Sequence, residues 1–443
     1  MTKEKILKEI YNKKINAIWL QFVDILGFPK LIEISSKRLE KVIDNGIAFD
    51  GSSIEGFVRI EESDMVLHPD LDTFTVLPWT LDQSIKIARL IGNVYGHNGK
   101  PFSGSPRYML KKVMEEAKKS GFYMNNGTEE EFFLFRLTED KKPSTKLVSD
   151  GSYFEMLPED IGEKTRIEIA VTLEKMGFEI EASHHEVAPS QHEIDFKYAD
   201  ALTAADRVTT FKIVAKTIAL QKELYATFLP KPIFGINGSG MHTHVSLFSK
   251  NGKNIFYDPG KQFGLSNTAL YFLGGLLKHA KAITAITNPI VNSYKRLVPG
   301  YEAPVYMCWA EKNRSALIRV PLGESEEKRI EYRSPDPTTN PYLALAAILK
   351  AGLDGIKNKI TPPKPANNIN IYELSAKEKS AMGIDILPST LKEAIQELKK
   401  DKVTLSALGD HIAGKYIEAK EKEWDEYRTY VTDWEIKNSL PIY

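Results

Sequence analysis

The sequence has a single cysteine, no long uncharged apolar segment and no excess of charge of either sign. Cys308 is the one thiol among 443 residues, which excludes an intramolecular disulfide and a cysteine-rich zinc or iron–sulfur site. The 59 Lys and Arg balance the 59 Asp and Glu, so no global field recruits nucleic acid or an anionic membrane surface. The most apolar stretch, 269–277, is too short to cross a bilayer. We therefore predict an enzyme without nucleic-acid or membrane partners.

Two glycine-rich phosphate-binding signatures, Gly-x-x-x-x-Gly-Lys-Ser/Thr and Gly-x-Gly-x-x-Gly, are also absent. A nucleotide, if one binds, must be held through metal ions and arginines. The first ten residues are charged and lack the apolar centre of a secretion signal. Together with the scarcity of cysteine, this predicts a cytoplasmic location.

A segment rich in Gly, Pro, Ser and Asn, 92–106, divides the chain. It predicts a small α+β domain over 1–103 and a larger domain over 104–443. In the first domain we expect helices at 4–14 and 36–44 and strands at 17–23, 31–34, 74–77 and 85–92. In the second we expect helices at 106–121, 201–225, 341–358 and within 390–430, and strands at 132–136, 178–181, 192–196, 242–248 and 316–320. Because helices and strands do not alternate regularly, a mainly antiparallel sheet flanked by helices is favoured over a doubly wound parallel one.

Three consecutive glutamates precede the apolar run Phe-Phe-Leu-Phe at 132–135. On a strand, Glu129 and Glu131 share one face while Glu130 points to the other. Two neighbouring carboxylates repel each other unless a cation lies between them. The pattern therefore predicts either a cation site or a solvated acidic edge.

Histidines next to further glutamates favour the cation site. Five of the nine histidines fall between 184 and 244, within the blocks 183–193 and 237–246. In the second block, His242, His244 and Ser246 alternate onto one face of a strand. Ligands that are mostly carboxylates, with a single histidine, favour Mg²⁺ or Mn²⁺ over zinc, and such ions commonly hold substrate phosphates.

Positive side chains gather between 292 and 333. The group comprises Lys295, Arg296, Arg314, Arg319, Arg329 and Arg333, with Glu302 and Glu331 among them. Arginine binds phosphate and carboxylate through two parallel hydrogen bonds, so the set predicts an anion-binding site. Arg329 alone we interpret as a surface charge.

Seven blocks in order along nearly the whole chain resemble type I glutamine synthetases, specifically the alpha-like subgroup. The blocks lie at 49–54, 129–135, 185–193, 231–246, 292–302, 313–315 and 329–337. The resemblance implies a β-grasp N-terminal domain and a catalytic domain like that of guanidino kinases, assembled as a homododecamer of two hexameric rings with shared active sites. It also implies ATP-dependent ligation of ammonia to L-glutamate through γ-glutamyl phosphate, and a nitrogen-regulatory protein as a further partner.

The resemblance assigns a role to each candidate residue. The metal ligands, for two or more ions per site, would be Glu131, Glu186 and Glu193 for one ion and Glu129, His242 and Glu331 for another. Glutamate would be bound by Asn237, Gly238, Arg296, Glu302 and Arg333, and ATP by Glu181, His244, Ser246, Arg314 and Arg319. Asp50, contributed by a neighbouring subunit, would bind ammonium and remove a proton from it. Glu302 would close the site as a flap, and Arg319 would stabilise the transferred phosphoryl group.

Two departures from the family pattern bear on these assignments. Thr128 and Glu130 stand where the family commonly has prolines, which loosens the frame of the metal-binding strand. Tyr372 lies in a region resembling the one adenylylated in another subgroup, but the flanking sequence of that subgroup is missing. Arg59 occupies the position of an arginine that senses glutamine, which favours feedback inhibition by glutamine.

Two other functions remain open from the sequence. A γ-glutamyl–amine ligase would use the same fold with a polyamine in place of ammonia, although the presence of Asp50 and Glu302 favours ammonia. A non-catalytic assembly protein with this fold would not need the carboxylate ligands that the chain keeps.

Overall fold

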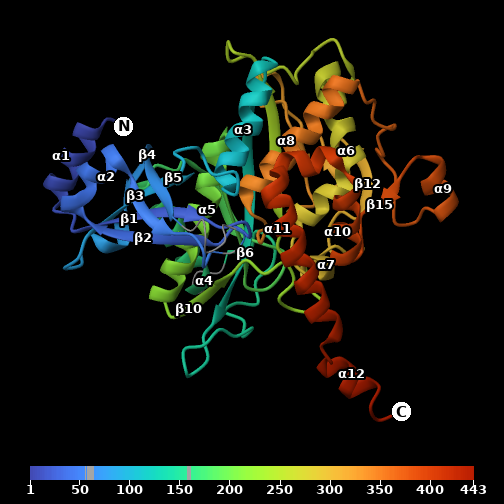
Figure 1. Cartoon of the computed structure of the whole chain (residues 1–443). Helices are drawn as coiled ribbons and strands as arrows, with labels where there is room; N and C mark the ends of the chain where they lie inside the picture. The colour runs from blue at the N-terminus through green and yellow to red at the C-terminus, as the bar shows by residue number, and fades with distance from the viewer. Residues whose placement is uncertain (55, 57–63, 157–160) are drawn as a thin grey trace.

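Two β-sheets organise the chain in the computed structural model, which describes residues 1–54, 56, 64–156 and 161–443 (Figure 1). The smaller sheet has the strand order β2-β1-β5-β4-β3. Its strands are β1 (Ala17–Val23), β2 (Pro29–Ser35), β3 (Ile47–Asp50), β4 (Asp64–Val76) and β5 (Ile87–Gly96). Helices α1 (Lys3–Lys13) and α2 (Leu39–Asn45) belong to the same unit, and Ile6 of α1 is buried in one core with Ile18, Leu67 and Leu90.

The larger sheet has the order β15-β12-β13-β14-β11-β6-β8-β7, and the short strands β9 and β10 also pair with β6. Its pairs are antiparallel except β12 with β13. The strands are β6 (Tyr123–Arg136), β7 (Ile180–His185), β8 (Gln191–Phe196), β9 (Ala199–Asp200), β10 (Leu224–Thr227), β11 (Met241–Phe248), β12 (Tyr306–Ala310), β13 (Ala316–Arg319), β14 (Ile330–Tyr332) and β15 (Asp385–Ile386).

Helices surround this sheet and supply most of the main core. They are α3 (Pro106–Lys119), α4 (Ile161–Lys175), α5 (Ala201–Gln221), α6 (Asn267–Thr287), α7 (Ser293–Arg296), α8 (Pro341–Asn358), α9 (Ala376–Ala381), α10 (Leu391–Lys400), α11 (Lys402–Thr429) and α12 (Asp433–Asn438). Polar side chains fix the helix starts, since Asn340 accepts hydrogen bonds from the N–H groups of Tyr342 and Leu343, and Asp200 does the same for α5. Among the described residues, no helix is both long and apolar enough to cross a membrane.

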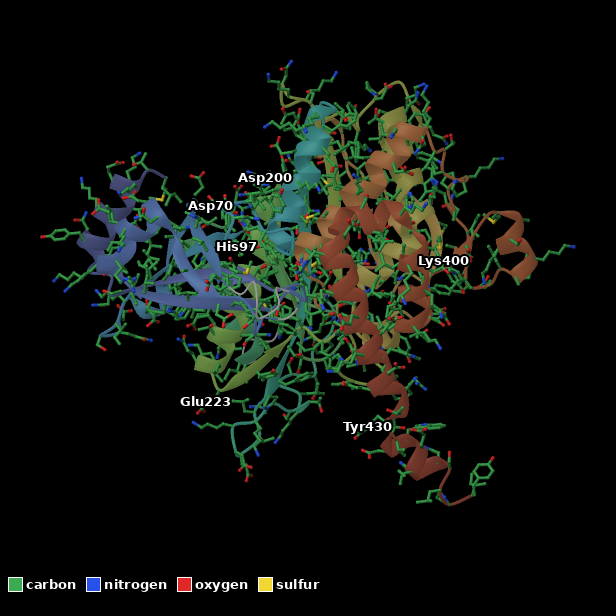
Figure 2. The ribbon with its side chains drawn as sticks, in the orientation of Figure 1. Asp70, His97, Asp200, Glu223, Lys400 and Tyr430 are labelled. Carbon is green, nitrogen blue, oxygen red and sulfur yellow. The ribbon has the colours of Figure 1, made fainter. Side chains whose placement is uncertain are left out.

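A buried arginine joins the small sheet to helices α3 and α5 of the larger unit. Arg107 of α3 donates two hydrogen bonds to Asp206 of α5, at 3.0 and 2.7 Å, and others to Asp70 of β4 at 3.0 Å and Asn93 of β5 at 2.7 Å. Asp70 and Asp200, labelled in Figure 2, line the cleft between the small sheet and α5. Four charge-assisted or polar contacts to one buried side chain give the two units a fixed attachment.

The predicted fold class is confirmed, with differences in individual elements. β3 was not expected, and the helix expected to 225 ends at Gln221 because Glu223 adopts a left-handed backbone with φ 58° before β10 begins. The helical segment expected within 390–430 is divided where Asp401 caps α11, and Gly409, with φ 72°, breaks the helical geometry of α11. The domain boundary at 103/104 lies between β5 and α3 and stays a prediction.

Candidate functional site

The long strand β6 is the centre of the acidic site, because its register places acidic and imidazole side chains side by side on three strands. Glu129 lies opposite His242 of β11 on one side and Asp195 of β8 on the other. Two residues further on, Glu131 lies opposite Glu193 of β8. Residues i and i+2 of a strand share a face, so all five of these side chains start from the same face of the sheet.

A first cluster forms where β6, β11 and β14 meet. The Oε2 atom of Glu129 lies 3.0 Å from Nδ1 of His242, and its Oε1 atom lies 2.6 Å from Nε2 of His244. Glu331 Oε1 lies 3.7 Å from His242 Nδ1. One ligand atom each from Glu129, His244 and Glu331 falls within 4.8 Å of the others, so both histidines of β11 reach these carboxylates. Burial opposes ionisation of Glu129, but His244 and His242 together hold its pKa well below the usual range.

A second cluster lies between β6, β8 and the turn after β7. His184 Nε2 is 3.1 Å from Oε1 of Glu186 and 3.5 Å from Oε1 of Glu193. Burial and the carboxylate of Glu186 raise the pKa of Glu131 to about 8, although Arg296 opposes the shift. Burial and the neighbouring Glu129 likewise raise the pKa of Asp195 to about 8. Buried carboxylates that destabilise one another's charge in this way are the donor set that a divalent cation neutralises, so these residues fit such an ion.

Next to these carboxylates lies a pocket that contains the five residues expected to bind glutamate. Its lining includes Asn237, Gly238, Arg296, Glu302 and Arg333, together with Glu131, Glu186 and His242. A Cβ atom at Gly238 would lie 2.0 Å from the carbonyl oxygen of Pro230, so only glycine fits there. Positive and negative side chains thus share one small cavity, which suits a ligand carrying carboxylate and ammonium groups.

Arginines hold the pocket wall. Arg296 is buried and donates to the carbonyl oxygen of Ser334 at 2.8 Å, which fixes its guanidinium beside the pocket. Glu331 is fully buried between Arg319 and Arg333, and Arg333 Nη1 donates to it at 2.6 Å. Burial disfavours the charge of Glu331, yet Arg333 lowers its pKa to about 2, so this carboxylate stays ionised.

Besides the cluster residues Glu129, Glu193, His244 and Glu331 and the neighbouring Arg319, four expected site residues lie outside the pocket lining. Ser246 continues the face of His242 and His244 on β11, Glu181 is exposed on β7, and Arg314 is exposed between β12 and β13. Asp50 is exposed at the end of β3, where its Oδ1 accepts a hydrogen bond from the Ser52 N–H at 2.8 Å. Arg59, expected to sense glutamine, lies outside the described residues.

Three further residues belong to the site and were not assigned to it from the sequence. His184 lies between Glu186 and Glu193, and Gln191 donates to Glu131 Oε2 at 3.0 Å and to the Gly238 carbonyl at 3.2 Å. Arg329, interpreted as a surface charge, instead donates from Nε to His244 Nδ1 at 3.1 Å, and that interpretation is wrong. His184 pairs with Glu193 across β7 and β8, so the cluster of histidines was the signal that could have identified it.

Comparison with known proteins agrees with this geometry. The family model for the glutamine synthetase catalytic domain matches residues 103–439, and the model for the glutamine synthetase β-grasp domain matches 14–97. Glutamine synthetases of Staphylococcus aureus and Staphylococcus epidermidis are 57% and 55% identical over 443 residues, which is 100% of this chain and 99% of the S. aureus protein. Among solved structures, Plasmodium falciparum glutamine synthetase superposes with a TM-score of 0.87 at 29% identity, covering 99% of both chains. A GmaS/ADP complex superposes with a TM-score of 0.88 at 32% identity, covering 98% of this chain and 99% of the other.

Proposed function

This chain belongs to the type I glutamine synthetase family, and on that premise we propose how its own residues carry out the reaction. It is a glutamate–ammonia ligase, which forms L-glutamine from L-glutamate and ammonia at the expense of ATP. We propose two steps. A γ-carboxylate oxygen of glutamate displaces ADP from the terminal phosphorus of ATP, and the nitrogen of ammonia then displaces phosphate from the resulting γ-glutamyl phosphate.

The family uses a divalent metal, and the mutual repulsion among the buried carboxylates supports one in this chain. We assign Glu131, Glu186 and Glu193 to one ion and Glu129, His242 and Glu331 to another, with His184 and His244 as their nearest imidazole neighbours. The preponderance of carboxylate oxygen favours Mg²⁺ or Mn²⁺. When bound, such ions would neutralise charge on the phosphate oxygens of ATP.

The pocket residues position the amino acid. Arg296 and Arg333 would attract its carboxylate, while Asn237 and the backbone of Gly238 would bind its α-amino end. Arg319, whose guanidinium contacts Glu331 at the mouth of the first cluster, would stabilise negative charge on the phosphoryl group during transfer. We assign the ATP contacts to Glu181, His244, Ser246 and Arg314 as well, and the ADP bound in the GmaS complex supports a nucleotide site on this fold.

Asp50 and Glu302 handle the second step. An aspartate near the intermediate can attract ammonium and accept its proton, which leaves a nucleophilic lone pair on nitrogen. Because Asp50 is exposed on the small sheet and is not among the described residues that line the pocket, we propose that it serves the site of a neighbouring subunit. Glu302 would close over the pocket and limit the entry of water. Shared sites require an oligomer, and the resemblance to the family leads us to propose a dodecamer of two hexameric rings.

One assay tests the function. The purified chain is supplied with ATP, glutamate, Mg²⁺ and either ammonium or putrescine, and the γ-glutamyl product and phosphate are quantified. The observation that carries the proposal is the single pocket that unites the five glutamate-binding residues with the metal carboxylates. We expect one glutamine per phosphate with ammonium and little product with putrescine. Faster turnover with putrescine would instead identify a γ-glutamyl–amine ligase.

Regulation is tested separately. Arg59→Ala should abolish inhibition by added glutamine while the uninhibited rate changes little, because we assign this side chain to sensing the product. The measurement is the initial rate of phosphate release over a series of glutamine concentrations. Inhibition that persists unchanged in this variant would show that glutamine acts elsewhere.

A further inference from the structure

Lys231, in the loop between β10 and β11, has surroundings that are unusual for a lysine. The side chain is 9% exposed, yet none of the described residues places a carboxylate within 4.0 Å of its Nζ atom. Nζ lies 3.8 Å from the centre of the Tyr301 ring and donates a hydrogen bond to the carbonyl oxygen of Ile236. The face of an aromatic ring attracts a cation, and the attraction grows when water is excluded.

The backbone of Lys231 is anchored from the other side. Its N–H donates to Oδ1 of Asn292 at 2.8 Å, and Nδ2 of Asn292 donates back to its carbonyl oxygen at 3.0 Å. Asn292 immediately precedes α7, which carries Arg296. The backbone of Lys231 is therefore tied to the start of the helix that carries Arg296.

Each of the two partners of this ammonium group adjoins a residue of the glutamate pocket. Ile236 immediately precedes Asn237, and Tyr301 immediately precedes Glu302. Asn237, Tyr301 and Glu302 line the pocket. Glu302 has a left-handed backbone, with φ 57°, which a side chain bearing a Cβ atom adopts only when neighbouring contacts hold it there. The contact of Lys231 with Tyr301 is available to supply that restraint.

We propose that Lys231 is a positioning residue that latches the segment carrying Tyr301 and Glu302 against the loop carrying Asn237. The inference rests on the proposed function, because the latch matters only if a hydrolysable acyl phosphate forms beneath it. When the latch is lost, water reaches the intermediate. The water oxygen bonds to the acyl carbon, the carbon–oxygen bond to phosphate breaks, and glutamate, phosphate and a proton are released. The sum is hydrolysis of ATP to ADP and phosphate.

The test compares glutamine formed with phosphate released in Lys231→Met, which keeps the length of the side chain and removes its charge. We expect the ratio of glutamine to phosphate to fall about fivefold, because the segment carrying Tyr301 and Glu302 would no longer exclude water from the intermediate. The KM for ammonium should rise as well. Lys231→Arg preserves a cation above the ring and should restore most of the ratio. The matched control is Lys379→Met, which removes another lysine–tyrosine pair, with Nζ 4.6 Å from the centre of the Tyr306 ring, outside the pocket lining.

A wild-type ratio in a folded Lys231→Met protein would overturn the latch, as would an equal loss of coupling in Lys379→Met. If Lys231→Met does not fold, Tyr301→Leu on the half-buried segment provides the same test, and a wild-type ratio there also overturns it. Failure of the wild-type protein to form any glutamine would instead refute the proposed function and, with it, this inference. The wild-type measurement therefore separates the two failures.

Discussion

Three consecutive glutamates of β6 fall into two kinds of surroundings, and the alternation of side chains along the strand explains why. Glu129 and Glu131 face the histidines and carboxylates of neighbouring strands, whereas Glu130 is fully buried on the opposite face. Neither oxygen of Glu130 has a hydrogen-bond partner among the described residues, and burial raises its pKa to about 7, although Lys212 opposes the shift. Glu130 can therefore serve as a control for substitutions of the neighbouring Glu131.

We expect Glu131→Gln to weaken binding of Mg²⁺ or Mn²⁺ at least tenfold, since it removes a negative ligand and leaves Glu186 and Glu193 without it. The matched control is Glu130→Gln, which makes the same change one residue away on the other face and should leave metal affinity unchanged. Calorimetric titration of the metal-free protein with Mn²⁺ measures both. Equal affinities in the two variants would contradict the metal assignment to Glu131.

At the residue scale, sequence reasoning succeeded where alternation along one strand carried the information. Glu129 with Glu131, and His242 with His244, were expected to share faces, and in the structure His242 lies close to both glutamates while His244 contacts Glu129. Gln191 and Lys231 could not be identified in this way. Gln191 donates to Glu131 and to the backbone carbonyl of Gly238, and Lys231 contacts the carbonyl oxygen of Ile236 and the ring of Tyr301. No periodicity in the sequence records such contacts.

At the scale of elements, a buried histidine joins three helices. His279 of α6 lies with Nδ1 2.5 Å from Asp401, the N-cap of α11, and with Nε2 3.0 Å from Asp354 of α8. With a carboxylate at each nitrogen, both ring nitrogens must donate, so the imidazole is favoured in its protonated form. Burial opposes that charge, but the two aspartates raise the pKa of His279 overall.

Stability should therefore depend on pH through this residue. A raised pKa in the folded protein gives stability that is present below the ordinary value of 6.5 and is lost as the pH rises through the folded value. Burial raises the pKa values of Asp354 and Asp401, but His279 lowers them overall. The stability that these two carboxylates contribute is therefore lost only at acid pH. His279→Gln should destabilise the protein by about 2 kcal/mol near pH 5.5 and by less near pH 9.

Urea unfolding at these two pH values measures the difference. Lys278→Gln is the control, because Lys278 contacts the same Asp354 at 3.2 Å but is half exposed. The loss in free energy of unfolding caused by Lys278→Gln should be small and nearly the same at both pH values. A His279→Gln penalty that does not change with pH would indicate that the histidine is neutral in the folded protein.

Sequence patterns predicted the elements that are long and strongly periodic, such as β1, α8 and the paired strands of the site. They did not predict β3, a strand of four residues with alternating intermediate and exposed positions, because so short a segment shows little periodicity. The apolar segment 269–277 forms part of α6, where most positions are buried, so the alternation of apolar and polar residues that would reveal a helix is weak. These two elements are defined by packing against neighbouring elements, which the local sequence does not show.

At the scale of the whole molecule, exposed apolar side chains near the C-terminus indicate contacts between subunits. Trp434 and Ile436 of α12, and Leu440, Ile442 and Tyr443 beyond it, are 48–101% exposed. This segment projects from the body beyond Tyr430 (Figure 2). Exposed apolar groups of this kind mark interaction sites, which agrees with the proposed assembly. The native particle should have twelve times the 50.0 kDa mass of the chain, and native mass spectrometry measures it.

Mixing two inactive variants tests whether active sites are shared between subunits. Asp50→Ala leaves the pocket intact and Arg333→Ala leaves Asp50 intact, so a working site needs the pocket of the first variant beside the Asp50 of the second. Subunits dissociated, mixed in equal amounts and reassembled at random should recover about a quarter of the wild-type rate of glutamine formation, because each requirement is met half of the time. The control is the same mixture assayed without dissociation, which should stay inactive. If Asp50 served the pocket of its own chain, reassembly would restore nothing, since every subunit would carry one defect in its own site.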